Sequence, residues 1–258
     1  MAFFEANNSK LTKFLQKQKV DILCLQEVVR EIDDTVLREY VTKEPIDLAT
    51  SELKYSFYGP NSIMDRFSMK GFHGQEDFKF DLGGLAEFGN YVRSKYQIVK
   101  AQNIFVENHF TYTLDRSNWP EEDYRAVLVV DLRVGAKQLR ILNYHGIWTR
   151  GKLGNDKSLK ACKIIAALAL EAKGEVVICG DFNLFPDTPS MQLFEEHFDS
   201  LVDQFKIKTT RPASNELSGL GRNVVDYIWV SKGVKVKSFE VLQSDVSDHL
   251  PLLLEFNI

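Results

Sequence analysis

The sequence predicts a layered α/β fold built on mixed β-sheets. Segments with the pattern of β-strands outnumber helical ones, and several are rich in β-branched residues. Residues 126–132 and 139–144 are joined through Gly135, which is typical of an antiparallel hairpin. A long amphipathic segment over residues 157–173 then separates two strand-like segments. These observations disfavour a purely parallel sheet and favour a mixed-sheet α/β fold.

The first third of the chain has one clear helix and one clear strand. Residues 10–19 place Leu11, Phe14 and Leu15 on one helical face, and residues 21–26 follow as a short buried strand. From residue 31 to residue 81 the pattern weakens. We expect mostly loop there, with one helix near residues 33–40 and turns at residues 58–61 and 71–74.

Regular structure returns in the rest of the chain. The helix over residues 157–173 carries an apolar stripe, Asp156 can cap its N-terminus, and Gly174 ends it. Strands are predicted at residues 91–94, 126–132, 139–144, 176–179, 225–230 and 252–256. No linker or repeat divides the chain, so we expect one domain over residues 1–258.

Composition limits the function classes and the location. The 32 Lys and Arg residues against 36 Asp and Glu residues give a net charge of −4, which disfavours a protein that coats nucleic acid. Cys24, Cys162 and Cys179 lie in apolar runs that favour reduced thiols, so a cytoplasmic location is expected. Residues 164–170 form the longest apolar run, far short of the roughly 20 residues of a membrane-spanning helix. We expect a monomer without a membrane span.

Polar residues gather at the ends of the predicted strands, where the active sites of sheet proteins collect. If these ends converge, the site combines four carboxylates, two imidazoles and an amide. Crowded carboxylates repel one another and need cations, and oxygen ligands suit Mg²⁺, with Mn²⁺ as a substitute. The candidates are Glu27, His145, Asp181, Asn183, Asp226, Asp248 and His249.

Each candidate also has a structural interpretation. Glu27 could be an acid at a helix N-terminus, residues 180–183 could form only a turn, and residues 248–249 could form a capped turn. Asp226 is harder to explain in this way, because a charged side chain inside an apolar strand must be paired or coordinated.

Five motifs, in this order along the chain, carry a resemblance to a known family. They are Leu-Gln-Glu-Val, Asn-Tyr-His-Gly, Gly-Asp-Phe-Asn, Val-Asp-Tyr-Ile and Ser-Asp-His-Leu-Pro. Together they resemble the endonuclease/exonuclease/phosphatase family of DNase I-like metal-dependent phosphoesterases. The resemblance implies a four-layer α/β sandwich, in which two mixed sheets pack face to face and helices lie outside.

The resemblance also implies roles for the residues of the first three motifs. Glu27 resembles the metal-binding glutamate of the family. His145 is similar to the histidine that contacts the scissile phosphate, and Asp181 to the aspartate that activates the nucleophilic water. Asn183 resembles the amide that positions phosphate or metal.

The last two motifs supply the remaining implied roles. Asp226 resembles the aspartate that supports the site, Asp248 the acid paired with histidine or metal, and His249 the terminal catalytic histidine. Family members open with a strand that ends in a metal-binding asparagine. Here that strand is expected to be absent or shortened. Asn7 and Asn8 precede the first helix but follow no strand-like run, so the ligand role is not transferred to either.

The predicted function is that of a Mg²⁺-dependent phosphoesterase. Water activated by Asp181 attacks phosphorus in line, metal held by Glu27 and Asp248 neutralises the phosphate, and His145 and His249 stabilise the transition state. A phosphodiesterase or nuclease is favoured. The alternatives are a phosphatase or phospholipase-like hydrolase that acts on a small or lipid phosphate, and a catalytically weakened binding module.

A positive cluster near the second motif has two interpretations. Arg150, Lys152 and Lys157 follow Trp148 and are typical of a solvated face, although such a cluster could hold phosphates. The histidines His73, His109 and His197 lie outside the motifs and are expected to be structural or at the surface.

Overall fold

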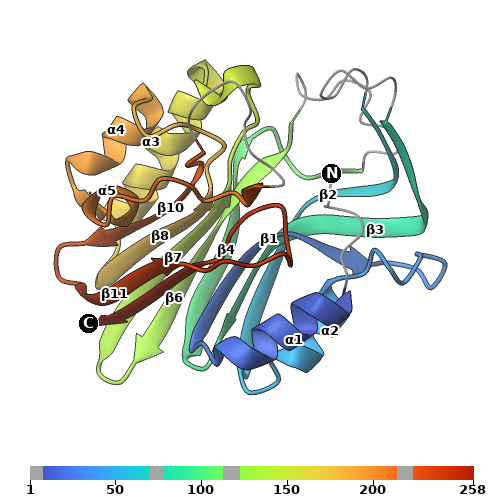
Figure 1. Cartoon of the computed structure of the whole chain (residues 1–258), viewed down its shortest axis with the longest axis horizontal. Helices are drawn as coiled ribbons and strands as arrows, with labels where there is room; N and C mark the ends of the chain where they lie inside the picture. The colour runs from blue at the N-terminus through green and yellow to red at the C-terminus, as the bar shows by residue number, and fades with distance from the viewer. Residues whose placement is uncertain (1–7, 70–77, 113–122, 214–222) are drawn as a thin grey trace.

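Two mixed β-sheets lie face to face at the centre of the fold, with helices on both outer sides (Figure 1). The computed structural model describes residues 8–69, 78–112, 123–213 and 223–258. The main apolar core fills the space between the sheets and continues under the helices of the second sheet. This arrangement confirms the four-layer α/β sandwich.

The first sheet has the strand order β1-β3-β2-β5. Strands β1 and β2 pair antiparallel with β3, and β5 pairs parallel with β2. Helices α1 and α2 cover its outer face, where Leu15, Ile46 and Ala49 pack against Val28 and Tyr91. The elements are α1 (Asn8–Gln18), β1 (Ile22–Glu31), α2 (Lys43–Ala49), β2 (Tyr55–Met69), β3 (Phe78–Ser94) and β5 (Thr111–Tyr112).

The second sheet has the strand order β4-β6-β7-β8-β10-β9. Only the β7–β8 pair is parallel among its described strand pairs, and β6–β7 is the predicted hairpin. Strands β11 (Lys235–Val241) and β12 (Leu252–Asn257) pair with each other. The sheet contains β4 (Gln97–Glu107), β6 (Arg125–Val134), β7 (Lys137–His145), β8 (Glu175–Asp181), β9 (Phe198–Ser200) and β10 (Asp226–Ser231).

Helix α3 (Asp156–Leu170) packs its apolar stripe on the second sheet, together with α4 (Pro189–Glu195) and α5 (Leu201–Gln204). Its N-cap is Asn155, whose side chain accepts a hydrogen bond from Ser158 N, so the predicted cap Asp156 is wrong by one residue. The helix also ends before the predicted residue 173. Gly174 follows the helix and packs closely against β7, because a Cβ on it would lie 2.1 Å from the Gln138 carbonyl oxygen.

The prediction of mostly loop between residues 31 and 81 is wrong. The 15-residue strand β2 lies within it, helix α2 occupies residues 43–49, and the 17-residue strand β3 begins at residue 78. The predicted turn at residues 58–61 lies inside β2, where a bulge between Pro60 and Ser62 accommodates a proline without a backbone donor. The predicted turn at residues 71–74 lies outside the described residues.

The helix expected near residues 33–40 is also wrong, and the helix lies at α2 instead. Residues 33–40 form turns and bends. The Asp33 carboxylate accepts hydrogen bonds from Thr35 N at 3.2 Å and Thr35 Oγ1 at 2.5 Å. Such local bonds compete with helix formation, because they offer the backbone another partner.

Side-chain amides bridge the two sheets. Asn143 on β7 donates to the carbonyl oxygens of Leu25 on β1 and Tyr91 on β3, at 2.9 and 3.2 Å. Asn90 on β3 donates to Ala126 O on β6 at 2.9 Å, and Asn103 on β4 donates to Pro60 O on β2 at 2.8 Å. The apolar core is therefore crossed by directional bonds between the sheets.

Other expectations concern thiols, membranes and the N-terminus. Cys24, Cys162 and Cys179 are free, as expected. Among the described residues, no helix is both long enough and apolar enough to cross a membrane. The expected loss of a first family strand concerns the segment before α1, and residues 1–7 lie outside the described residues.

Candidate active site

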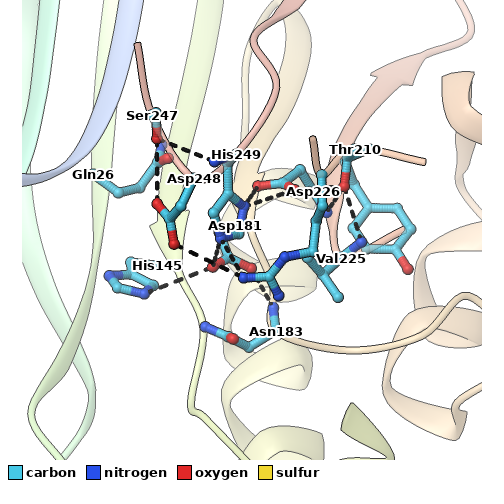
Figure 2. A network of polar contacts seen from close by, with 12 residues as sticks. Gln26, His145, Asp181, Asn183, Thr210, Val225, Asp226, Ser247, Asp248 and His249 are labelled. Carbon is cyan, nitrogen blue, oxygen red and sulfur yellow. Dashed lines mark hydrogen bonds and ion pairs between the residues drawn. The ribbon is translucent and has the colours of Figure 1, made fainter. Parts of the chain in front are cut away.

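Strand register brings His145, Asp181 and Asp226 into one row. His145 ends β7 opposite Asp181 at the end of the parallel strand β8. Asp226 begins the antiparallel strand β10 opposite the same Asp181. Figure 2 shows these residues around one centre, together with Asn183, Asp248 and His249. Six predicted residues from four separate motifs thus come together.

The backbone next to Asp181 packs closely against β7. Gly180 has φ +136°, and a Cβ on it would lie 1.9 Å from the Tyr144 carbonyl oxygen. Phe182 is buried and makes edge contacts with the rings of Tyr144 and Tyr227, with centroids 5.3 and 5.7 Å away. This apolar anchor holds the flanking residues Asp181 and Asn183 on the side of the site.

Glu27 reaches the site from the first sheet. A bulge between Leu25 and Val28 interrupts the β1–β3 pairing, and Glu27 has φ +55°. Its Oε1 lies 3.5 Å from His145 Nε2. Burial and the nearby negative charge of Asp248 raise the pKa of Glu27 to about 8, although Arg125 and His249 act in the opposite direction. The site is thus shared between the two sheets.

Asp181 lies between two imidazole rings. Its Oδ2 is 3.8 Å from His145 Nε2 and 3.7 Å from His249 Nε2, while its Oδ1 accepts a hydrogen bond from Asn183 N at 2.7 Å. Burial raises the pKa of this carboxyl group, and the charges of His249 and Lys152 oppose that rise. One carboxylate oxygen is held by the backbone and the other faces the centre of the site.

His249 is oriented by Asp226. Its Nδ1 donates to Asp226 Oδ1 and Oδ2 at 2.8 and 2.9 Å, so Nε2 faces the site. Thr210 Oγ1 donates to Asp226 Oδ2 at 2.5 Å and fixes the carboxylate in turn. Burial lowers the pKa of His249, but the charges of Asp226 and Asp181 and the hydrogen bond outweigh it and raise the pKa to about 9.

The guanidinium group of Arg125 contacts the Nδ1 side of the His145 ring. Arg125 Nη1 lies 2.9 Å from His145 Nδ1, and Arg125 Nε donates to the buried Asp123 at 2.7 Å. A guanidinium group does not lose its proton, so it must be the donor in this contact. His145 Nδ1 is then the acceptor, and Nε2 carries the proton that faces Glu27 and Asp181.

The predicted positive cluster does not act as a unit. Lys152 is buried and donates to Asn183 Oδ1, and its Nζ lies 5.2 Å from the centre of the Trp148 ring. Burial lowers the pKa of Lys152 to about 8. Arg150 is exposed, and Lys157 pairs with Glu107 at 2.8 Å. His109 and His197 are exposed as expected, and His73 lies outside the described residues.

The donor set fits a hard divalent cation. Ligand atoms of Asp181, Asp226 and His249 lie within 4.8 Å of one another, but His249 Nδ1 and Asp226 already bond to each other. Glu27 and Asp248 add two carboxylates that are close enough for the charge of Asp248 to raise the pKa of Glu27. Oxygen ligands of this kind suit Mg²⁺ or Mn²⁺.

Sequence reasoning missed Arg125, Thr210 and Arg211, and it did not place Lys152 inside the site. Arg125 begins the apolar strand β6, which runs antiparallel to β7, so the start of β6 lies at the same edge as His145. A search of strand starts as well as strand ends would have found it. Thr210 and Arg211 lie outside the strands, and no pattern in the sequence singles them out.

The chain is similar to proteins of known family and known structure. A model of the Endonuclease/Exonuclease/phosphatase family matches residues 2–249. A search of curated proteins gave no match.

Solved structures of low sequence identity share the fold. An endonuclease/exonuclease/phosphatase from Beutenbergia cavernae is 16% identical with a TM-score of 0.73, and the alignment covers 98% of this chain and 66% of that one. Mannosyl-6-phosphatase from Bacteroides thetaiotaomicron is 14% identical with a TM-score of 0.64, and 99% and 92% are covered. D. rerio TDP2 complexed with a single-strand DNA product is 13% identical with a TM-score of 0.65, and 100% and 94% are covered.

Proposed function

The chain belongs to the endonuclease/exonuclease/phosphatase family, and from this premise we propose that it is a divalent-metal-dependent phosphoesterase. The reaction is hydrolysis of a P–O bond by in-line attack of an activated water. The observation that carries the proposal is the position of Asp181 Oδ2, 3.8 and 3.7 Å from the Nε2 atoms of His145 and His249. A base and two charge-stabilising groups thus face one centre.

Asp181 is the proposed general base. Its Oδ1 is held by Asn183 N, which leaves Oδ2 to orient and deprotonate a water. His249, oriented by Asp226, and His145, oriented by Arg125, place their Nε2 atoms where they can stabilise charge on the phosphoryl oxygens.

Glu27 and Asp248 are the proposed metal ligands, and Asp181 lies close enough to contribute. Mg²⁺ or Mn²⁺ bound there would supply Lewis-acid stabilisation of the phosphate charge. Lys152 Nζ donates to Asn183 Oδ1, and Asn183 Nδ2 donates to Gly146 O at 3.2 Å. This amide is therefore fixed from both ends, as expected for a group that positions a substrate.

A phosphodiester, as in a nuclease, is the first proposed substrate, in line with the DNA product bound by the structurally similar TDP2. A phosphomonoester is the second. The observation that favours it is the presence of three buried cationic side chains beside the site, Arg125, Lys152 and Arg211, because a monoester carries more negative charge than a diester.

Hydrolysis of model esters tests the proposal. We would measure release of p-nitrophenol from bis- and mono-p-nitrophenyl phosphate, and cleavage of DNA and RNA, after EDTA treatment and after addition of Mg²⁺ or Mn²⁺. The expected result is activity that EDTA abolishes and the metal restores, with Asp181→Asn as the inactive control. Activity that survives exhaustive chelation would exclude the metal mechanism, and binding without hydrolysis would indicate a binding module.

A further inference from the structure

We propose that Arg211 is a further catalytic residue, whose Nε and Nη2 atoms bind two oxygens of the phosphoryl group. The inference rests on the proposed phosphoesterase function. Arg211 is buried, and its Nη2 lies 3.2 Å from His249 Nε2 and 4.0 Å from Asp248 Oδ2. The guanidinium group therefore lies inside the site, next to a group proposed to act on the phosphate.

Two other arginines of this chain show which groups bind to the edge of a guanidinium group that carries Nε and Nη2. Arg140 donates from Nε and Nη2 to the two carboxylate oxygens of Asp131, at 2.7 and 2.9 Å. Arg30 directs its Nε and Nη2 at Glu87 Oε2. In both cases an anionic group fills the fork formed by these two nitrogen atoms.

The same fork of Arg211 holds no anion. Its Nε is buried and has no hydrogen-bond partner among the residues that the structure describes. A buried donor without a partner is unfavourable, and more so when it is charged. The Asp248 carboxylate, 4.0 Å from Nη2, is too far to fill the fork. An anion that offers two oxygens side by side, such as a phosphoryl group, can accept one hydrogen bond from Nε and one from Nη2.

The backbone holds Arg211 in this place. Thr209 Oγ1 accepts from Arg211 N at 3.1 Å and donates to Arg211 O at 2.7 Å. The next residue, Thr210, accepts a backbone bond from Leu250 N at 2.8 Å and donates its hydroxyl to Asp226. The turn that carries Arg211 is thus hydrogen-bonded to Asp226, which orients His249, and to Leu250, the residue after His249.

The position of the fork relative to His249 assigns its role. Arg211 Nη2 donates toward His249 Nε2, 3.2 Å away, so a phosphoryl oxygen that accepts from Nη2 also lies beside His249, and Nε can bind a second oxygen of the same group. Lysine at this position keeps the charge but offers no planar fork. The difference between the two side chains therefore separates bidentate phosphate binding from simple charge.

The test compares Arg211→Lys with the intact chain and with Arg133→Lys. Arg133 is an exposed residue of β6 near the hairpin turn, at the end of the sheet opposite the site. We would measure kcat and KM for bis- and mono-p-nitrophenyl phosphate with Mg²⁺. Arg211→Lys should lower kcat/KM by about 10²-fold, the order for loss of one positioned donor, with most of the loss in kcat. Arg133→Lys should leave both constants unchanged.

Two further measurements keep the inference separate from a structural role. The affinity for inorganic phosphate, measured by calorimetry without metal, should fall about tenfold in Arg211→Lys, as expected for loss of a bidentate charge-assisted contact. Activity of Arg211→Ala should be partly restored by free guanidinium ion at concentrations that leave the thermal unfolding of the protein unchanged.

The outcomes distinguish this inference from the proposed function. If the intact chain hydrolyses no phosphoester, the proposed function fails. If the intact chain is active and Arg211→Lys has normal kinetics and phosphate affinity, the role of Arg211 is wrong. An Arg211→Lys protein that unfolds at lower temperature, together with an Arg211→Ala protein that guanidinium does not rescue, would also overturn it in favour of a structural role.

Discussion

Glu27 should release a proton when a divalent metal binds. Burial and Asp248 raise its pKa to about 8 in the metal-free protein, so at pH 7 about nine-tenths of the molecules carry a protonated Glu27. A metal ligand must be the carboxylate, and binding therefore displaces this proton. The expected release from Glu27 is about 0.9 proton at pH 7 and close to zero at pH 9.5.

The same shift predicts how affinity depends on pH. Below pH 8 a metal ion competes with the proton on Glu27, so the affinity should rise with pH, approaching tenfold per unit well below the pKa, and level off above it. Calorimetric titration with Mn²⁺ in two buffers of different ionisation enthalpy measures both the affinity and the number of protons released.

Two variants isolate the contribution of Glu27 from that of its neighbours. His249 also titrates near the site, so the quantity of interest is the difference between the intact chain and Glu27→Gln. Glu195→Gln, at an exposed position on α4, serves as the control and should behave as the intact chain. Equal proton release from the intact chain and Glu27→Gln at pH 7, or an affinity that is flat from pH 6 to pH 8, would refute the reasoning.

Further predictions concern catalysis, pH and packing. Asp181→Asn and His249→Ala should each lower kcat at least about 10²-fold while circular dichroism stays unchanged, and a folded, fully active Asp181→Asn protein would contradict the assignment. Asp226→Asn removes the charge that raises the pKa of His249, a stabilisation that is complete below about pH 6.5 and lost as the pH rises through about 9. The unfolding free energy that Asp226→Asn loses relative to the intact chain, measured with urea, should therefore be larger at pH 6 than at pH 9.5. An equal loss at both pH values would count against the pairing of Asp226 with His249. Thr210→Val removes a 2.5 Å bond to a carboxylate and should cost about 1.5–3 kcal/mol of unfolding free energy, more than Thr210→Ser, which keeps the hydroxyl. Cys162→Ala, in the buried stripe of α3, should lower the melting temperature and leave kcat unchanged; a large change in kcat would be inconsistent with its position.

The sequence predicted the second sheet better than the first. Strands β6, β7, β8 and β10 are short, strongly apolar runs, and their pattern alone identifies them. Strands β2 and β3 contain glycine, proline and charged residues that are typical of turns. Their strand structure depends on long-range pairing and on the approach of Gly59 to Leu128 and Asn103 across the sheets, which local pattern does not report.

The predicted site residues share a property that a sequence displays, namely a polar side chain beside an apolar run. The register of β7, β8 and β10 then follows from which strands pair, and it places His145, Asp181 and Asp226 opposite one another. Arg211 lacks such a neighbour run. Its place beside His249 depends on the tertiary bonds of Thr210, and only the folded structure reveals it.

The amide bridges between the sheets bear on how far the site tolerates motion. Glu27 comes from one sheet and Asp181 from the other, so a slide of one sheet over its partner directly changes the distance from the proposed metal ligand to the proposed general base. Apolar packing resists separation of the sheets but has no preferred direction within the interface. Asn143, which bonds Leu25 just before the Glu27 bulge while its own strand ends at His145, opposes that slide. The alignment of the two halves of the site is therefore set in the interior of the protein, by an amide that touches neither substrate nor metal.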